Sequence, residues 1–153
     1  MNDLILYPLF AFVACVGFAV IYNIHGLGIL ICAFGGALGW LAYLLSAPLL
    51  QSDISQTMVA AVVIAAYAEI MARIRRCPVT GYLLVAIFPL VPGGGVYYTM
   101  EHAVNGENEL FLDSFLHTLG LAGAIAVGVL LVSSLVRMWG IFHHHVSQKE
   151  GKA

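Results

Sequence analysis

The feature of this sequence that most constrains its fold is the absence of charged side chains over long stretches. No Asp, Glu, Lys or Arg occurs between Asp3 and Asp53, a run of 49 residues, and two further uncharged runs cover residues 77–100 and 114–136. A helix that crosses a bilayer needs about 20 apolar residues. Only 9% of the residues are charged, against about 25% in an average soluble domain. The sequence therefore predicts an all-α integral membrane protein.

Composition and motifs exclude several other classes of protein. The formal net charge of −2 leaves no basic surface for nucleic acid. The sequence contains neither G-x-S-x-G nor H-E-x-x-H, and no pair of carboxylates lies inside an apolar stretch, so we expect no enzymatic activity. The three cysteines form no C-x-x-C pair, and the three contiguous histidines at 143–145 lack the spacing of a helical metal site. We therefore expect neither a metal nor a cofactor.

Five apolar segments are candidates for membrane crossings. The four uninterrupted ones are residues 4–22, 27–45, 57–72 and 114–135. A fifth segment, residues 79–105, is apolar but interrupted. We predict about five transmembrane helices in a single domain over residues 1–142, followed by a short polar tail at residues 143–153.

The fifth segment contains a break. Residues 89–95 read Pro-Leu-Val-Pro-Gly-Gly-Gly. Each proline lacks a backbone donor, and the glycines adopt conformations that other residues avoid. Each flanking piece has about 10–12 residues, which at 1.5 Å per residue covers about half of a bilayer. We predict one crossing made of two half-helices, or a re-entrant hairpin, broken near the membrane midplane.

The basic residues favour the single broken crossing. They form one group after the third span and one after the last: Arg73, Arg75, Arg76, Arg137, Lys149 and Lys152. Because cytoplasmic segments carry the excess of Lys and Arg, we expect both groups on the same side. A single broken crossing meets this condition, with the N-terminus outside and the C-terminus in the cytoplasm, whereas a re-entrant hairpin separates the groups. Residues 101–113, with four acids and no base, are then external.

Three of the spans carry small residues at helical spacing. These are Gly35 and Gly39 in the second span, Ala61, Ala65, Ala68 and Ala72 in the third, and Gly120, Ala124 and Gly128 in the last. In lipid, such residues let helix backbones approach closely. They predict either packing inside the bundle or contact with a second subunit. Because a bundle of five spans has little interior, we expect a homo- or hetero-oligomer.

The break is the first candidate for a functional site. Non-helical backbone at membrane depth is tolerated only where protein buries it or water lines it. A half-helix that begins near Gly94 presents free N–H groups and its positive dipole end to an anion, as discontinuous helices of transporters do to a substrate carboxylate. The predicted substrate-binding residues are Pro89, Pro92, Gly93, Gly94, Gly95 and Tyr98. The alternative is that the two prolines merely end a helix in an external loop.

Two ionisable residues after the break are candidates for proton coupling. Helical spacing puts Tyr98, Glu101 and His102 on one face. An imidazole changes charge near physiological pH, so His102 is the favoured proton carrier and Glu101 a group that couples with it. The alternative is an external helix end that water solvates.

Further polar residues lie at the ends of other spans. Glu69 stands four residues before Arg73, where an interfacial ion pair competes with a role in proton relay, because an ionisable group at membrane depth is costly. Asn23 and His25 form a polar turn between the first two spans and are candidates for gating an inner mouth. His117 begins the last span, and its role is open in the same way.

Two segments resemble a known family. Residues 79–106, VTGYLLVAIFPLVPGGGVYYTMEHAVNG, resemble the proline-and-glycine signature of the threonine/serine exporter family, and residues 16–40, VGFAVIYNIHGLGILICAFGGALGW, are also similar to it. The chain resembles in particular the small, separately encoded subunit that corresponds to the C-terminal half of the full-length exporter. Asn23 falls on the family's polar turn, while His25 stands where relatives often carry proline. The residues that fall on the signature are Pro89, Pro92, Gly93 and Gly94.

The resemblance implies a five-span half-transporter in the cell inner membrane that is active only with a larger membrane subunit. It implies export of a small carboxylate-bearing metabolite, threonine or serine or a small dicarboxylate, driven by the proton gradient. The rival hypothesis is a non-transporting assembly or scaffold subunit, whose small-residue seams serve only for docking. A channel is a third hypothesis, but no ring of filter carbonyls or charges is evident.

Overall fold

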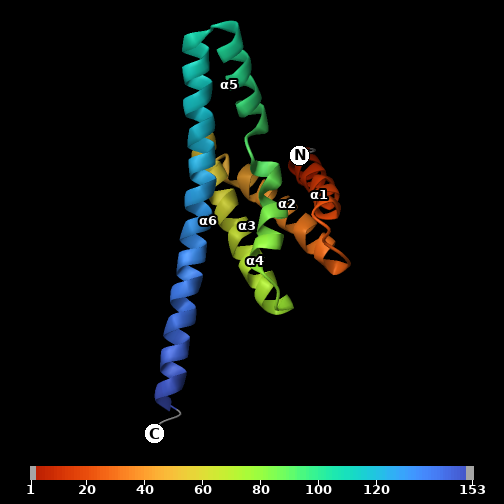
Figure 1. Cartoon of the computed structure of the whole chain (residues 1–153), viewed down its shortest axis with the longest axis vertical. Helices are drawn as coiled ribbons and strands as arrows, with labels where there is room; N and C mark the ends of the chain where they lie inside the picture. Colours follow the sequence, from red (N-terminus) through yellow and green to blue (C-terminus); the bar gives the residue numbers. More distant parts are fainter. Residues whose placement is uncertain (1–2, 151–153) are drawn as a thin grey trace.

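The computed structural model describes the backbone of residues 3–150 and the side chains of residues 4–139. The elements in chain order are α1 (Asp3–Ile21), α2 (Leu27–Ser46), α3 (Asp53–Arg75), α4 (Val79–Ile87), the 3₁₀ helix η1 (Phe88–Leu90), α5 (Gly93–Asn105) and α6 (Asn108–Glu150). No strand occurs within residues 3–150. Figure 1 shows a bundle of α1 to α4 beside the long helix α6, with α5 folded back along one end of α6.

The predicted all-α membrane architecture is confirmed. Four helices, α1, α2, α3 and α6, are long and apolar enough to cross a membrane. A further pair, α4 with η1 and, after a bend of 55°, α5, is long and apolar enough when taken together to form a broken span or a re-entrant loop. Both halves run in the same general direction, away from the end of α3 that carries its arginines (Figure 1). With a bend of 55°, the second half continues past the first instead of folding back on it.

Two helices are longer than the sequence predicts. The third begins at Asp53 instead of residue 57. The buried Gln56 side chain donates a hydrogen bond to the Leu50 carbonyl at 2.7 Å. This bond satisfies a polar side chain in the first turn, so the polar residues before 57 can be helical. The last continues as backbone to Glu150. The predicted polar tail thus begins inside α6, but its side chains and residues 151–153 lie outside the described part of the chain.

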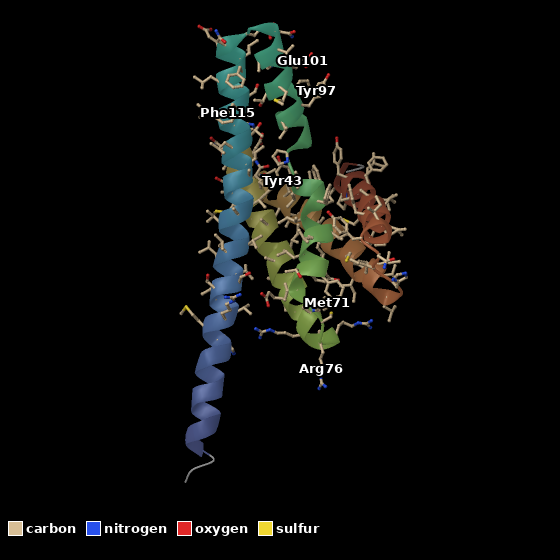
Figure 2. All side chains as sticks on the ribbon, viewed as in Figure 1. Tyr43, Met71, Arg76, Tyr97, Glu101 and Phe115 are labelled. Carbon is tan, nitrogen blue, oxygen red and sulfur yellow. The ribbon has the colours of Figure 1, made fainter. Side chains whose placement is uncertain are left out.

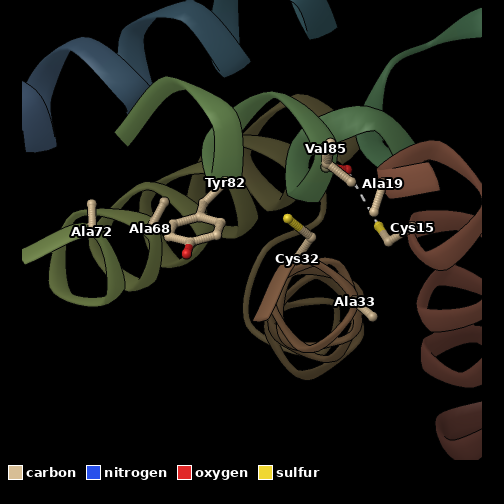
Figure 3. Close-up of a cluster of buried hydrophobic side chains, with 8 residues drawn as sticks. All are labelled: Cys15, Ala19, Cys32, Ala33, Ala68, Ala72, Tyr82 and Val85. Atoms are coloured by element: carbon tan, nitrogen blue, oxygen red, sulfur yellow. Dashed lines mark hydrogen bonds between the residues drawn. The ribbon is translucent and has the colours of Figure 1, made fainter. Parts of the chain in front are cut away.

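The small residues of α2 are used inside the bundle. This helix lies between α1, α3 and α4 and contacts all three. A methyl group on Gly36 would overlap the sulfur of Cys15 in α1, and one on Gly39 would overlap Ile64 in α3. The Cys15 thiol is itself bonded to the Val85 carbonyl of α4 at 3.3 Å (Figure 3). For this seam, packing inside the chain is the correct interpretation.

The seam between α3 and α6 is also internal. A Cβ on Gly128 would lie 3.0 Å from Ala61 and 3.1 Å from the Met58 carbonyl oxygen, and one on Gly120 would lie 2.7 Å from Ile54. The residue numbers of the contacting pairs increase together along the two helices, from Ile54 with Gly120 to Ala61 with Gly128, so α3 and α6 are parallel. Close backbone approach of this kind is what holds helices together in lipid.

The parallel course of α3 and α6 gathers the described basic residues at one end of the molecule. The Arg73 guanidinium donates to the Val136 carbonyl at 3.4 Å, next to Arg137. The acidic residues between α5 and α6 lie at the opposite end, where Figure 2 shows Glu101 far from Arg76. This distribution agrees with the single broken crossing.

Helix α5 is packed differently from the rest. Among the described elements it contacts α6 and no other helix, and it stands beyond the α1–α4 bundle (Figure 1). Its side chains Tyr97, Met100 and Val104 are exposed in the single chain. The second half of the broken crossing is therefore supported on one side only.

Candidate functional site

The prolines determine the shape of the break. Helix α4 passes into η1, which contains Pro89, and Val91 then leaves the helical region with φ −62° and ψ 127°. A residue before proline is restricted to such extended values, because the next ring clashes with a helical conformation. Pro92 lies outside the helix at φ −76° and ψ 62°, and α5 begins with Gly93. The sequence thus ends one half-helix and starts another within four residues.

The start of α5 presents backbone donors to its surroundings. The Gly93 N–H bonds back to the Val91 carbonyl at 2.7 Å, and the first helical bond runs from Val96 to the Pro92 carbonyl at 3.1 Å. Among the described backbone bonds, none uses the N–H of Gly94 or Gly95. These two N–H groups are the orphan donors that every helix N-terminus leaves, at its positive dipole end.

The three glycines differ in the space around them. A Cβ on Gly93 would meet nothing within 4 Å, and one on Gly94 would meet only the Tyr98 ring, at 4.0 Å. By contrast, a Cβ on Gly95 would overlap the Thr118 hydroxyl of α6. Gly94 is therefore open to a ligand, with Tyr98 beside it, while Gly95 also permits the close approach of α5 to α6.

The height of the break along the bundle follows from its neighbours. Leu90 lies 3.9 Å from a Cβ built on Gly39, at the level of Ile64 in the middle of α3. Gly95 lies against Thr118, two residues before the Gly120 that faces Ile54 in the first turn of α3. The break thus extends from the middle of α3 to its N-terminal end.

The two predicted proton carriers on α5 are not paired with each other. The Nδ1 atom of His102 lies 2.6 Å from the Oε2 atom of Glu107, in the turn after α5. Glu101 instead lines a shallow surface hollow of about 300 Å³ with Tyr97 and Val104. Sequence reasoning missed Glu107, because a separation of five residues matches no helical spacing and needs the turn at Gly106.

Asn23 and Glu69 lie toward the opposite end, away from the break. Asn23 sits in the turn between α1 and α2 with φ 57°. The next residue, Ile24, contacts Gly28 at the start of α2. The predicted ion pair of Glu69 with Arg73 is not formed, since within residues 4–139 the one ion pair is His102 with Glu107.

The predicted residues therefore form two groups. The first is the break with Tyr98, followed along α5 by Glu101 and His102, and the second is the polar turn and Glu69 near the basic end. In the described part of the chain no group of three or more His, Cys, Asp or Glu side chains is placed to hold a metal ion. The first group offers backbone donors near an exposed tyrosine, which suits an anionic or carboxylate-bearing ligand.

The fold and this site define a multi-pass helical membrane protein with one bent, discontinuous helix pair, and discontinuous helices are known from transporters. The family model described as "Threonine/Serine exporter, ThrE" matches residues 7–135. The chain belongs to this family, as the resemblance indicated, and transport of the threonine/serine-exporter type is the function that membership implies. No curated protein and no solved structure matches the chain.

Proposed function

We propose that the chain is a subunit of a secondary exporter and that the N-terminus of α5 receives the carboxylate of a small metabolite such as threonine, serine or a dicarboxylate. One observation carries the proposal: the N–H groups of Gly94 and Gly95 have no backbone partner among the described bonds, and they lie inside the uncharged run 77–100. A carboxylate satisfies both donors and interacts favourably with the helix dipole.

The proposed site needs a second protein surface. Helix α5 contacts only α6 among the described elements, so the described part of the chain supplies no helix opposite Gly94. Non-helical backbone in a membrane has to be enclosed by protein or by a water-filled cavity. We therefore propose that a larger membrane subunit of the same exporter completes the site, with this chain corresponding to the C-terminal half of a full-length exporter.

Transport is proposed to be coupled to protons in the cell inner membrane. His102, with Glu101 one residue before it, provides the ionisable groups on the helix that carries the carboxylate site. The positive-inside rule orients the end with Arg73 and Arg137 toward the cytoplasm, which places the C-terminus inside. Asn23 and Glu69, near that end, are proposed to gate the inner mouth.

The test is export from liposomes that contain this chain together with the larger subunit, compared with liposomes that contain the larger subunit alone. We expect threonine or serine export only from the pair. Equal export without this chain would favour the rival hypothesis of an assembly or scaffold subunit.

A matched pair of variants then tests the site. Gly94→Val adds a side chain where only Tyr98 is near, and Gly123→Val adds the same side chain to α6, where nothing lies within 4 Å. At neither position would the added Cβ overlap a described residue. We expect Gly94→Val to abolish export and Gly123→Val to retain it, both with normal membrane insertion. Full export by Gly94→Val would refute the site.

A further inference from the structure

The turn that joins α5 to α6 has a specific helix-ending geometry. Gly106 has a left-handed backbone with φ 72°. Its N–H bonds to the Ala103 carbonyl at 3.4 Å, and the N–H of Glu107 bonds to the His102 carbonyl at 3.0 Å. These two bonds, one closing over three residues and one over five, define a Schellman motif.

The side chains at the two ends of this motif are unusual for it. The residues joined by the longer bond commonly make a hydrophobic contact. Here they are His102 and Glu107, whose Nδ1 and Oε2 atoms lie 2.6 Å apart, with the side chains 22% and 46% exposed. The turn is thus closed by one backbone bond and one titratable side-chain contact between the same two residues.

Protonation of the imidazole strengthens this contact. It converts a neutral–ion hydrogen bond into an ion pair, with the cation at the C-terminus of α5 and the anion at the N-terminus of α6, where each also interacts favourably with the helix dipole. The other charged groups of this end are Glu101 on α5 and Glu109 and Asp113 on α6. No Lys or Arg occurs in residues 77–136, so within this stretch no permanent cation competes with His102 for Glu107.

The contact lies where it can control α5. This helix is attached to the described bundle through the break at one end, through the Gly106 turn at the other, and along its length only through α6. Because α5 contacts no other described helix, the turn and the packing along α6 together determine how firmly the helix is fixed against α6.

We propose that Glu107 is a positioning residue for His102. Protonation of His102 tightens the α5–α6 turn through Glu107 and fixes α5 against α6, and deprotonation loosens it. The link from this turn to export rests on the proposed function, since it is α5 that begins with the carboxylate site. The carboxylate of Glu107 contacts His102 and not the substrate.

Amide hydrogen exchange of the full chain in lipid vesicles tests the turn without any transport measurement. After correction for the intrinsic pH dependence of exchange, we expect protection of residues 102–108 to rise about threefold from pH 8 to pH 5.5, because a charge-assisted hydrogen bond is stronger than a neutral one. Glu107→Gln keeps the shape and a hydrogen-bonding side chain but removes the charge. We expect this rise to vanish in Glu107→Gln and in His102→Gln.

The matched control is Glu109→Gln, which removes the next acid of the same end and should keep the rise. A wild-type chain whose protection does not change with pH overturns the proposal. So does a Glu107→Gln variant that responds as the wild type does.

Export at pH 5.5 and pH 8, from liposomes that also contain the larger subunit, separates the two proposals. We expect Glu107→Gln to lose most of the pH dependence of export and Glu109→Gln to keep it. Gly94→Val should lose export while its turn still responds to pH. If Gly94→Val exports substrate and its turn still responds to pH, the carboxylate site is refuted and the positioning role is not. If Glu107→Gln keeps a normal pH dependence of export, the positioning role is refuted.

Discussion

The α1–α4 bundle and the α5–α6 hairpin are held together in different ways. In the bundle, glycines of α2 face buried side chains of α1 and α3, and Cys15, Cys32 and Ile64 are completely buried. In the hairpin, α5 contacts one described helix only, and its single buried residue is Thr99. An apolar groove of about 320 Å³, lined by residues such as Met100 and Phe115, remains open between α5 and α6.

This difference indicates which part of the chain can move. Close-packed interfaces resist displacement, because any shift loses contacts or creates overlap. A helix supported on one side belongs to the least stable part of a structure, from which moving elements are drawn. We therefore expect the bundle to be the fixed part of the proposed exporter and α5 to be the part that changes its position.

The largest effect is expected from overpacking the bundle. Gly36→Val places a branched side chain against the sulfur of Cys15 and the backbone of α4, and we expect it to destabilise the protein by about 3 kcal/mol. Unfolding by denaturing detergent measures this. Gly17→Val in α1, where nothing lies within 4 Å, should change stability by no more than about 0.5 kcal/mol. Equal stabilities of the two variants would contradict the internal seam.

A smaller effect is expected where the break meets the bundle. The Phe88 ring of η1 lies 3.8 Å, centroid to centroid, from the Phe18 ring of α1. Phe88→Ala removes this contact, and we expect a loss of about 1.5 kcal/mol in the same detergent titration. Phe10→Ala, which truncates an exposed ring of α1, is the control. A larger loss from the control would show that the break is not anchored through Phe88.

The smallest effect on global stability is expected in the hairpin. Gly95→Val overlaps Thr118 and separates the start of α5 from α6. Because α5 is supported by no other described helix, we expect global unfolding to change by less than about 0.5 kcal/mol, while amide exchange of α5 accelerates about tenfold. A loss of global stability as large as that of Gly36→Val would remove the contrast between the two regions.

The fold could be predicted largely from the sequence. The uncharged runs indicate which segments can lie in a membrane, and the Pro-Gly segment indicates where a helix is interrupted. The parallel course of α3 and α6 follows from the arginines, because a basic group after each of the two spans predicts that both spans end on the same side. The contacts of the candidate site could not be predicted in the same way. The role of Gly95 depends on Thr118, which lies 23 residues later, and the pairing of His102 with Glu107 depends on the left-handed Gly106.

The most direct test asks whether the N–H groups at the start of α5 bind a carboxylate. The chain is labelled with ¹⁵N at its 16 glycines, and its amide spectrum is measured together with the larger subunit in lipid nanodiscs. The comparison is between threonine and threoninol, which keeps the amine and both the side-chain methyl and hydroxyl groups but has no carboxylate. We expect threonine to shift the Gly94 and Gly95 signals while Gly123 stays unchanged, and threoninol to shift none of the three. Gly94 and Gly95 signals that do not respond to threonine, or that respond equally to threoninol, would contradict the account.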